Sequence, residues 1–286
     1  MFSTATREDP IETLELRDTE KASVLVLAPG RGGMVTRWTV AGREVLYMED
    51  AALRDPTKNV RGGIPVLFPQ PGKLEGDVFE RDGHRGSMKQ HGFARNLAWT
   101  VVRRGTDGAA SALLRLTSNE VTRASFPWEF VAEYSYILRG AVLRVEQRFT
   151  NAGTEAMPFG AGFHPYFQVK QAEKKAARVG TTATRAFDNV TKQTLPLVVD
   201  LAGPETDLHL EDHGAKPCTL DWASGSIAVR GSEEYRHWVL WTVANKDFVC
   251  VEPWTCPGNA LNTGNRLLVL PPGETRTLWI EIEVAR

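Results

Sequence analysis

The chain has few cysteines, almost no net charge and no long apolar run, and each of these features excludes a class of protein. Its three cysteines, Cys218, Cys250 and Cys256, are odd in number and form no C-x-x-C pair. This argues against a disulfide framework and against a zinc site. We therefore expect reduced, buried thiols and a cytoplasmic location. The net charge of −1 provides no general attraction to nucleic acid or to an anionic membrane.

Membrane and export signals are also missing from the sequence. No apolar run approaches the roughly 20 residues that a membrane-spanning helix requires. Residues 1–10 contain several charges and no apolar segment, so we expect no signal peptide there. The sequence also contains no linker, low-complexity tract or repeat. We expect a single domain over residues 1–286, a monomer or weak dimer that binds a small molecule.

Alternation of apolar and polar residues is the dominant pattern. It is clearest over Leu143–Phe149 and Leu278–Val284, where apolar residues share one face. Further strands are expected at Ser23–Leu27, Met34–Val40, Glu44–Tyr47, Ala98–Arg103, Ala112–Thr117, Phe130–Leu138, Met157–Phe163, Ile227–Arg230, His237–Val243, Phe248–Glu252 and Arg266–Leu270. Helical periodicity is confined to residues 122–125 and 172–177. Many short strands with few short helices predict an all-β fold, a large antiparallel β-sandwich.

Residues 61–72, RGGIPVLFPQPG, carry polar groups that a sheet core does not need. The paired glycines and three prolines indicate a loop of fixed shape that holds Arg61 and Gln70 over a short apolar strand. Both side chains are candidates for substrate binding. The same residues are also compatible with a tight surface turn and a solvated arginine. A phosphate-binding glycine loop does not fit, because neither of its usual motifs is present.

Residues 90–99, QHGFARNLAW, combine a histidine, an amide, an arginine and two aromatic residues just before a predicted strand. Aromatic faces together with planar hydrogen-bonding groups suit a sugar, which offers C–H faces and many hydroxyls. His91 and Arg95 are therefore candidates for sugar binding, although a histidine taken singly is more often structural.

Two ionisable residues, His164 and Glu252, each end a predicted strand and each precede a proline. The proline keeps the preceding backbone extended. Glu252 lies on the strand face opposite Val249 and Val251, and its carboxylate must reach solvent or find partners because unpaired burial is costly. This pattern fits two rigid groups aimed into one cleft. It fits equally well two edge residues with unrelated roles.

At these segments the chain resembles the aldose 1-epimerase superfamily, and in its first half the hexose-6-phosphate mutarotase branch. The matching stretches follow the family's order and are RGGIPVLFPQPG at Arg61–Gly72, QHGFARNLAW at Gln90–Trp99, GFHPYF at Gly162–Phe167, TDLHL at Thr206–Leu210 and FVCVEPW at Phe248–Trp254. The resemblance implies a galactose mutarotase-like supersandwich. It also implies an isomerase that interconverts the α and β anomers of an aldose without a metal or cofactor.

The resemblance assigns roles to individual residues. His164 would be the catalytic acid and Glu252 the catalytic base. The sugar site would be lined by Arg61, His91, Arg95 and Asp207, to which we add Gln70 from the 61–72 loop. With an ordinary pKa of about 4.3, a glutamate is ionised at neutral pH. A histidine, with an ordinary pKa of about 6.5, can give and regain a proton.

The identity of the sugar is the open question. Arg61 and Arg95 favour a hexose 6-phosphate, because guanidinium groups suit a phosphate dianion. Two departures from that branch keep an unphosphorylated aldose such as glucose or galactose as the alternative: a longer polar loop at 73–89, and a segment at 254–262 closer to general aldose epimerases. Other hypotheses are a non-catalytic carbohydrate-binding sandwich, a glycosidase, which ordinarily needs two carboxylates, and a cupin-like metalloenzyme, which needs clustered histidines.

Overall fold

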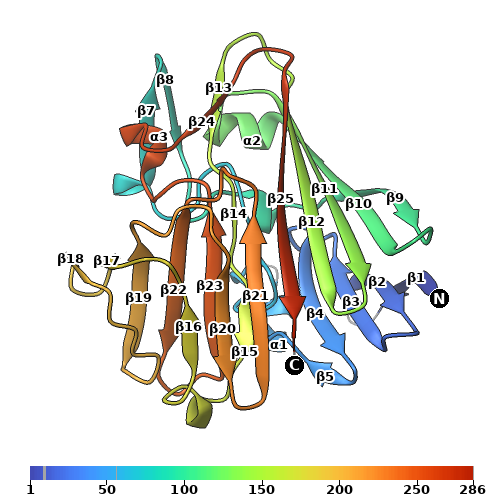
Figure 1. The fold of residues 1–286 in the computed structure, drawn as a ribbon. Coiled ribbons are helices and arrows are strands. Elements are labelled where there is room, and N and C mark those ends of the chain that lie inside the picture. The colour runs from blue at the N-terminus through green and yellow to red at the C-terminus, as the bar shows by residue number, and fades with distance from the viewer. Residues whose placement is uncertain (9–10, 56, 286) are drawn as a thin grey trace.

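Antiparallel β-strands make up about half of the chain, so the predicted all-β class is confirmed (Figure 1). The computed structural model describes residues 1–8, 11–55 and 57–285. In these residues the α-helices are limited to α1 (Asp50–Arg54), α2 (Glu120–Ser125) and α3 (Ala260–Thr263). No helix in these ranges has the length and apolar character that a bilayer crossing requires.

The described strands form three larger sheets and two small ones. The first sheet has the order β1 (Phe2–Glu8), β2 (Glu12–Asp18), β3 (Ser23–Ala28), β4 (Met34–Val40) and β5 (Arg43–Glu44). The second has the order β16 (Arg178–Gly180), β20 (Cys218–Trp222), β21 (Gly225–Gly231), β25 (Thr275–Val284), β12 (Val142–Asn151), β11 (Phe130–Arg139), β10 (Ala110–Thr117) and β9 (Thr100–Gly105). The third has the order β18 (Gln193–Pro196), β17 (Arg185–Asp188), β19 (Glu205–Leu210), β22 (His237–Val243), β23 (Phe248–Trp254), β14 (Gly162–Phe163) and β6 (Val66–Leu67), with β15 (Tyr166–Gln168) also paired to β23. The small sheets pair β13 (Met157–Phe159) with β24 (Leu268–Leu270), and β7 (Val78–Arg81) with β8 (His84–Ser87).

Burial follows the alternation that the sequence predicts. In β11 every second residue is buried, and its neighbour β12 follows almost the same rule. The main hydrophobic core takes residues from all three larger sheets, from Leu14 to Val284. The single domain expected over residues 1–286 remains a prediction. In contrast to these half-buried strands, β23 is buried at all seven positions, so its glutamate lies inside the protein.

Some predicted elements differ from the observed ones. The strand expected over 157–163 is divided into β13 and β14, because the Gly160 main-chain N–H donates to the Pro69 carbonyl. The helix expected at 172–177 is wrong: only a 3₁₀ turn forms at Gln171–Glu173. The Lys174 side chain points inward there and donates to Thr242 Oγ1 at 2.7 Å, which ties the segment to β22. The helix expected at 122–125 is α2, which Asn119 caps.

The polar loop at 73–89 folds into the β7–β8 hairpin, next to α3 in Figure 1. Asn262 of α3 bonds this hairpin twice: its Oδ1 accepts from the Glu80 main-chain N–H at 3.0 Å, and its Nδ2 donates to the Val78 carbonyl at 3.0 Å. Phe79 of the hairpin stacks on Trp128. The hairpin is therefore held by α3 and by the segment beside α2.

Candidate active site

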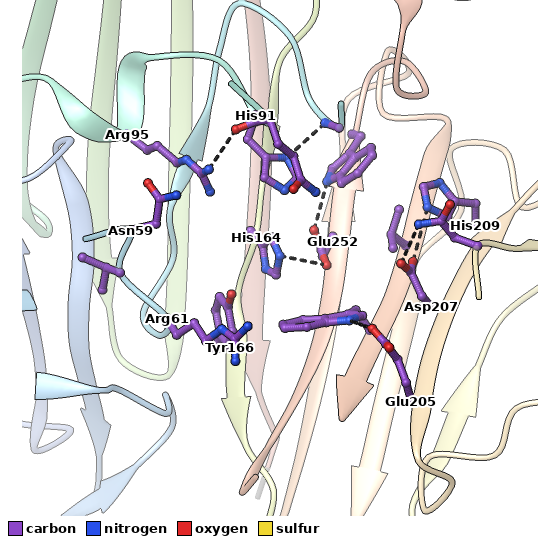
Figure 2. Close-up of a pocket in the computed structure, with 17 residues that line it drawn as sticks. Asn59, Arg61, His91, Arg95, His164, Tyr166, Glu205, Asp207, His209 and Glu252 are labelled. Carbon is purple, nitrogen blue, oxygen red and sulfur yellow. Dashed lines mark hydrogen bonds and ion pairs between the residues drawn. The ribbon is translucent and has the colours of Figure 1, made fainter. Parts of the chain in front are cut away.

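A pocket of about 390 Å³ lies on the third sheet, on the face opposite the main core (Figure 2). Strands β15, β19, β22 and β23 and the loops around residues 59–61 and 90–95 line it. The structure brings six of the seven candidate residues together in this pocket: Arg61, His91, Arg95, His164, Asp207 and Glu252. No residue of the 73–89 hairpin, all of which is described, lines the pocket.

Cross-strand pairing explains how side chains from distant segments reach the same face. In β19 alternate residues point into the core, so Asp207 and His209 both point into the pocket. In register, His209 is opposite Val239 of β22, which is opposite Glu252 of β23. Asp207 is opposite Trp241, one step further along the same strands. The sheet therefore presents a carboxylate, an imidazole and an indole around Glu252.

His164 and Glu252 face each other at the centre of the pocket (Figure 2). The main-chain N–H of His164 donates to the Pro65 carbonyl, and its imidazole stacks on the Tyr166 ring at 4.6 Å. The His164 Nε2 atom lies 3.4 Å from Glu252 Oε1. The other carboxylate oxygen of Glu252 accepts a 3.2 Å hydrogen bond from the Trp254 indole. The two ionisable groups are thus held at a distance at which one proton can be shared.

Burial favours the neutral form of this pair when no sugar is bound. Burial, helped by the charge of Asp207, raises the pKa of Glu252 well above its ordinary value. Burial, helped by the charge of Arg95, lowers the pKa of His164 to about 3. The expectation of an ionised Glu252 assumed an ordinary pKa, and the buried position of this carboxyl changes it. Both pKa shifts favour the uncharged pair in the sugar-free pocket, with the shared proton on Glu252.

His91 is fixed by two bonds to the same residue. Its main-chain N–H donates to the Gly72 carbonyl at 2.7 Å, and its Nδ1 accepts from the Gly72 N–H at 3.0 Å. Burial lowers the pKa of His91 well below its ordinary value. The ring is therefore neutral and carries its proton on Nε2. At the following residue, Gly92, a Cβ atom would lie 2.2 Å from the Phe68 carbonyl oxygen, so only glycine allows this turn.

Arg61 and Arg95 bring two positive charges to one side of the pocket. The Arg61 guanidinium carbon lies 5.8 Å from the centre of the Trp241 ring. The Nη2 of Arg95 donates to the Gln90 carbonyl at 2.8 Å, while its buried Nε has no hydrogen-bond partner. Within the described part of the chain, neither arginine forms an ion pair. Two guanidinium groups are therefore free to bind an anion.

Asp207 is the fixed carboxylate on the opposite side of the pocket. Burial opposes its charge, but hydrogen bonds from His209 and Asn189 outweigh this and lower its pKa. Asn189 Nδ2 donates to Oδ2 at 2.7 Å, and His209 Nε2 lies 3.4 Å from Oδ1. A carboxylate offers about four acceptor positions, so Asp207 retains acceptor positions for sugar hydroxyls.

Gln70 is the one candidate that does not line the pocket, so its expected role in substrate binding has no support from the pocket geometry. Its side chain is fully buried. Its Nε2 donates to the carbonyls of Pro71 and of Pro257, the latter at 3.1 Å, and its Oε1 accepts from the Leu261 N–H at 3.0 Å. Gln70 therefore joins the 61–72 loop to α3 and to the segment before it.

Among the lining residues that were not selected from the sequence are four with aromatic rings: Tyr166, His209, Trp241 and Trp254. Three of them lie inside the quoted motifs, two residues from a selected one: Tyr166 after His164, His209 after Asp207 and Trp254 after Glu252. Because strand side chains alternate, a spacing of two places such a residue on the same face. This signal was available for His209 and Trp254, whereas Trp241 lies in a segment without any motif.

One cluster at the base of the pocket has the composition of a metal site. Ligand atoms of His164, Cys250 and Glu252 lie within 4.8 Å of one another. Burial raises the pKa of the Cys250 thiol well above its ordinary value, whereas a metal requires the thiolate. The fully buried thiol does not line the pocket. This arrangement does not favour a metal, and the expectation of a metal-free enzyme stays a prediction.

Comparisons with known proteins agree with this architecture. The sequence model of the aldose 1-epimerase family matches residues 12–283. The Slr1438 protein from Synechocystis sp. PCC 6803 has a solved structure with a TM-score of 0.92 and 40% identity, over 95% of each chain. A galactose mutarotase-like protein from Clostridium acetobutylicum shares the fold, with a TM-score of 0.84 and 18% identity over 100% of this chain and 99% of that one.

A relative from Cenchrus ciliaris bears the name "Putative glucose-6-phosphate 1-epimerase". It is 30% identical over 149 residues, which cover 48% of this chain and 42% of the relative. The chain therefore matches less than half of the length of that protein.

Proposed function

This chain belongs to the aldose 1-epimerase family, and we propose that it interconverts the α and β anomers of a hexose. A hexose 6-phosphate is the proposed preferred substrate. The observation that carries the proposal is the 3.4 Å approach of His164 Nε2 to Glu252 Oε1 inside a polar pocket. Anomer exchange by general acid–base catalysis requires one such group within reach of the anomeric hydroxyl and another within reach of the ring oxygen.

The proposed reaction opens and recloses the hemiacetal. Glu252 accepts the proton of the anomeric hydroxyl O1 while His164 donates a proton to the ring oxygen O5, and the C1–O5 bond breaks. The aldehyde then rotates about C1–C2, and closure on the other face reverses both proton transfers. His91 donates a hydrogen bond from its Nε2–H to the sugar, and Asp207 accepts hydrogen bonds from sugar hydroxyls. No hydride transfer takes place.

The proton count of the pair agrees with this cycle. Ring opening leaves Glu252 protonated and His164 neutral, which is the state that burial favours. The pocket therefore stabilises the complex with the open-chain aldehyde. Before the ring opens, the single proton must move from Glu252 to His164 across the 3.4 Å separation. The positive charge of Arg95 favours the ionised Glu252 needed at that moment.

A broad pH profile follows from these pKa shifts. As the pH falls, His164 takes up a proton in addition to the shared one only near its lowered pKa of about 3. As the pH rises, Glu252 loses the shared proton only above its raised pKa. We expect kcat to stay level as the pH falls through about 6.5, where an ordinary histidine titrates. The pH profile should be measured with glucose 6-sulfate as the substrate, because its anion does not titrate in this range. A loss of activity with a midpoint near 6.5 would contradict the proposal.

The distribution of charge in the pocket supports a phosphorylated sugar. Figure 2 shows Arg61 and Arg95 on one side of His164, and Asp207 and His209 on the other. A hexose 6-phosphate has the same polarity, with a dianion at one end and hydroxyls elsewhere. The two guanidinium groups supply paired donors for phosphate oxygens.

Substrate preference can be tested with Arg61→Ala. Losing a hydrogen bond to a charged group costs about 1.5–3 kcal/mol, so kcat/KM for glucose 6-phosphate should fall about 10- to 100-fold, and that for glucose should change far less. Arg61→Lys should recover part of the loss because the charge remains. Arg115→Ala, which removes a surface arginine paired with Glu133, is the control. Equal losses on both sugars would exclude a phosphate role for Arg61 and favour an unphosphorylated aldose.

The main alternative is a carbohydrate-binding sandwich without catalysis. Such a module needs the aromatic walls and Asp207 but has no need for a buried proton-sharing pair. Sugar binding without accelerated anomer exchange would favour it. The cytoplasmic location and the monomeric or weakly dimeric state remain predictions.

A further inference from the structure

Two histidines, His209 in the pocket wall and the buried His237 next to it, form a pair that the proposed reaction does not use. His209 Nδ1 lies 2.8 Å from His237 Nε2, and both rings contact Trp254. His237 does not line the catalytic pocket. It lines a neighbouring pocket of about 580 Å³, which shares Asn189 and His209 with the first. His237 is thus separated from the proposed sugar site by His209, on the side of the site where Asp207 lies.

When His209 carries a single proton, the hydrogen-bond chain from Asp207 through His209 to His237 has one consistent set of protons. Asp207 is ionised because its pKa is lowered, so it can only accept, and His209 Nε2 must carry the proton that faces it. With one proton on that ring, His209 Nδ1 is an acceptor. His237 Nε2 must then be the donor to His209. Burial lowers the pKa of His237 well below its ordinary value, so this ring is neutral and its single proton lies on Nε2.

A second contact connects His237 to the proposed base. His237 is opposite Trp254 in the β22–β23 register, and their rings stack at 5.6 Å with an angle of 26°. The indole N–H of Trp254 donates to Glu252 Oε2 at 3.2 Å. His237 therefore touches both the residue that holds Asp207 and the residue that holds Glu252.

We propose that His237 is a positioning residue: through His209 it orients Asp207 toward the sugar, and through Trp254 it holds the indole that donates to Glu252. This role rests on the proposed function, because it is defined by the placement of the two carboxylates around a sugar. The two connections have different effects. The connection through His209 to Asp207 affects sugar binding, whereas the connection through Trp254 to Glu252 affects proton transfer.

Substitutions at His237 separate the two connections. In His237→Phe the ring under Trp254 remains and the donor to His209 is lost, so KM should rise about 3- to 10-fold with kcat within about twofold of wild type. In His237→Ala the stack is lost as well, so kcat should also fall, by about 2- to 10-fold. His237→Gln places an amide N–H near the Nε2 position and should return KM close to the wild-type value.

His213 provides the matched control. It is also buried, bonds Thr181 Oγ1 at 2.6 Å and the Lys216 carbonyl at 2.7 Å, and packs on Trp238, but it has no contact with Asp207 or Glu252. His213→Phe should lower the unfolding temperature as much as His237→Phe does, with KM and kcat unchanged. An unchanged KM in His237→Phe, or an equal rise in His213→Phe, would overturn the positioning role. So would the failure of His237→Gln to restore KM.

Nitrogen NMR of the imidazoles in the sugar-free protein provides a readout that does not depend on activity. We expect both His209 and His237 as neutral Nε2–H tautomers, and a shift of the His209 Nδ1 resonance in His237→Phe but not in His213→Phe. A proton on His209 Nδ1 would refute the proposed direction of the hydrogen bond between His237 and His209. If the wild-type protein exchanged no anomers while these tautomers were found, the proposed function would fail and the hydrogen-bond chain would stand.

Discussion

Replacing Glu252 with glutamine should lower the rate of catalysed anomer exchange by about 10²- to 10⁴-fold, the usual contribution of a general acid–base group. This corresponds to about 3–5 kcal/mol of transition-state stabilisation. Glutamine has nearly the same shape, and its carbonyl oxygen can still accept from the Trp254 indole, but it cannot take the O1 proton. The free energy of unfolding should hardly change, because the burial penalty already favours an uncharged group at this position.

The control for this variant is Glu205→Gln. Glu205 lines the same pocket and accepts from the Trp241 indole at 3.0 Å, but it has no role in the proposed proton transfers. Its substitution should leave kcat within a few-fold of wild type. A Glu252→Gln protein that kept more than about a tenth of the wild-type rate, measured by polarimetry with the buffer rate subtracted, would rule out Glu252 as the base.

Replacing His164 with asparagine should reduce kcat by a similar factor of about 10²–10⁴. Asparagine cannot deliver a proton to the ring oxygen, and the stacking with Tyr166 is lost. Sugar affinity should change much less, because His91, Arg95 and Asp207 remain. The protein should remain folded, since the Nδ1 of His164 has no hydrogen-bond partner in the described structure, and Glu252 keeps the hydrogen bond from the Trp254 indole when its 3.4 Å contact with His164 is lost.

His84→Asn is the matched control, because His84 is bonded to Glu155 outside the pocket. A further comparison uses the double variant. If His164 and Glu252 act as one proton-sharing pair, His164→Asn combined with Glu252→Gln should be about as slow as either single variant. Losses that multiplied would indicate two independent roles and would contradict the shared proton.

Much of the fold could be predicted because period-two alternation is strong where one strand face is buried. Met34–Val40 and His237–Val243 are observed within their predicted limits. The edge strand β1 was missed because its residues are mostly exposed and show no regular alternation. The strand β19 was recognised only as a motif, although its buried residues do alternate.

The candidate site was predicted less completely, for two physical reasons. A side-chain amide has the same sequence signal whether it faces a ligand or a neighbouring loop, so the inward turn of Gln70 toward Pro257 was not predictable. Ionisation depends on burial as well as residue type. The sequence indicated ordinary values for His164 and Glu252, and only their buried positions reveal that the uncharged pair is favoured.

The most direct test of the central claim, one proton shared by His164 and Glu252 for anomer exchange, is exchange NMR on glucose 6-phosphate labelled with ¹³C at C1. With a trace of wild-type protein, we expect cross-peaks between the α and β C1 signals that grow with protein concentration, and no other product. With Glu252→Gln, the acceleration should be weaker by about 10²-fold or more. Exchange at the buffer rate with wild-type protein, for glucose 6-phosphate and for glucose alike, would contradict the account.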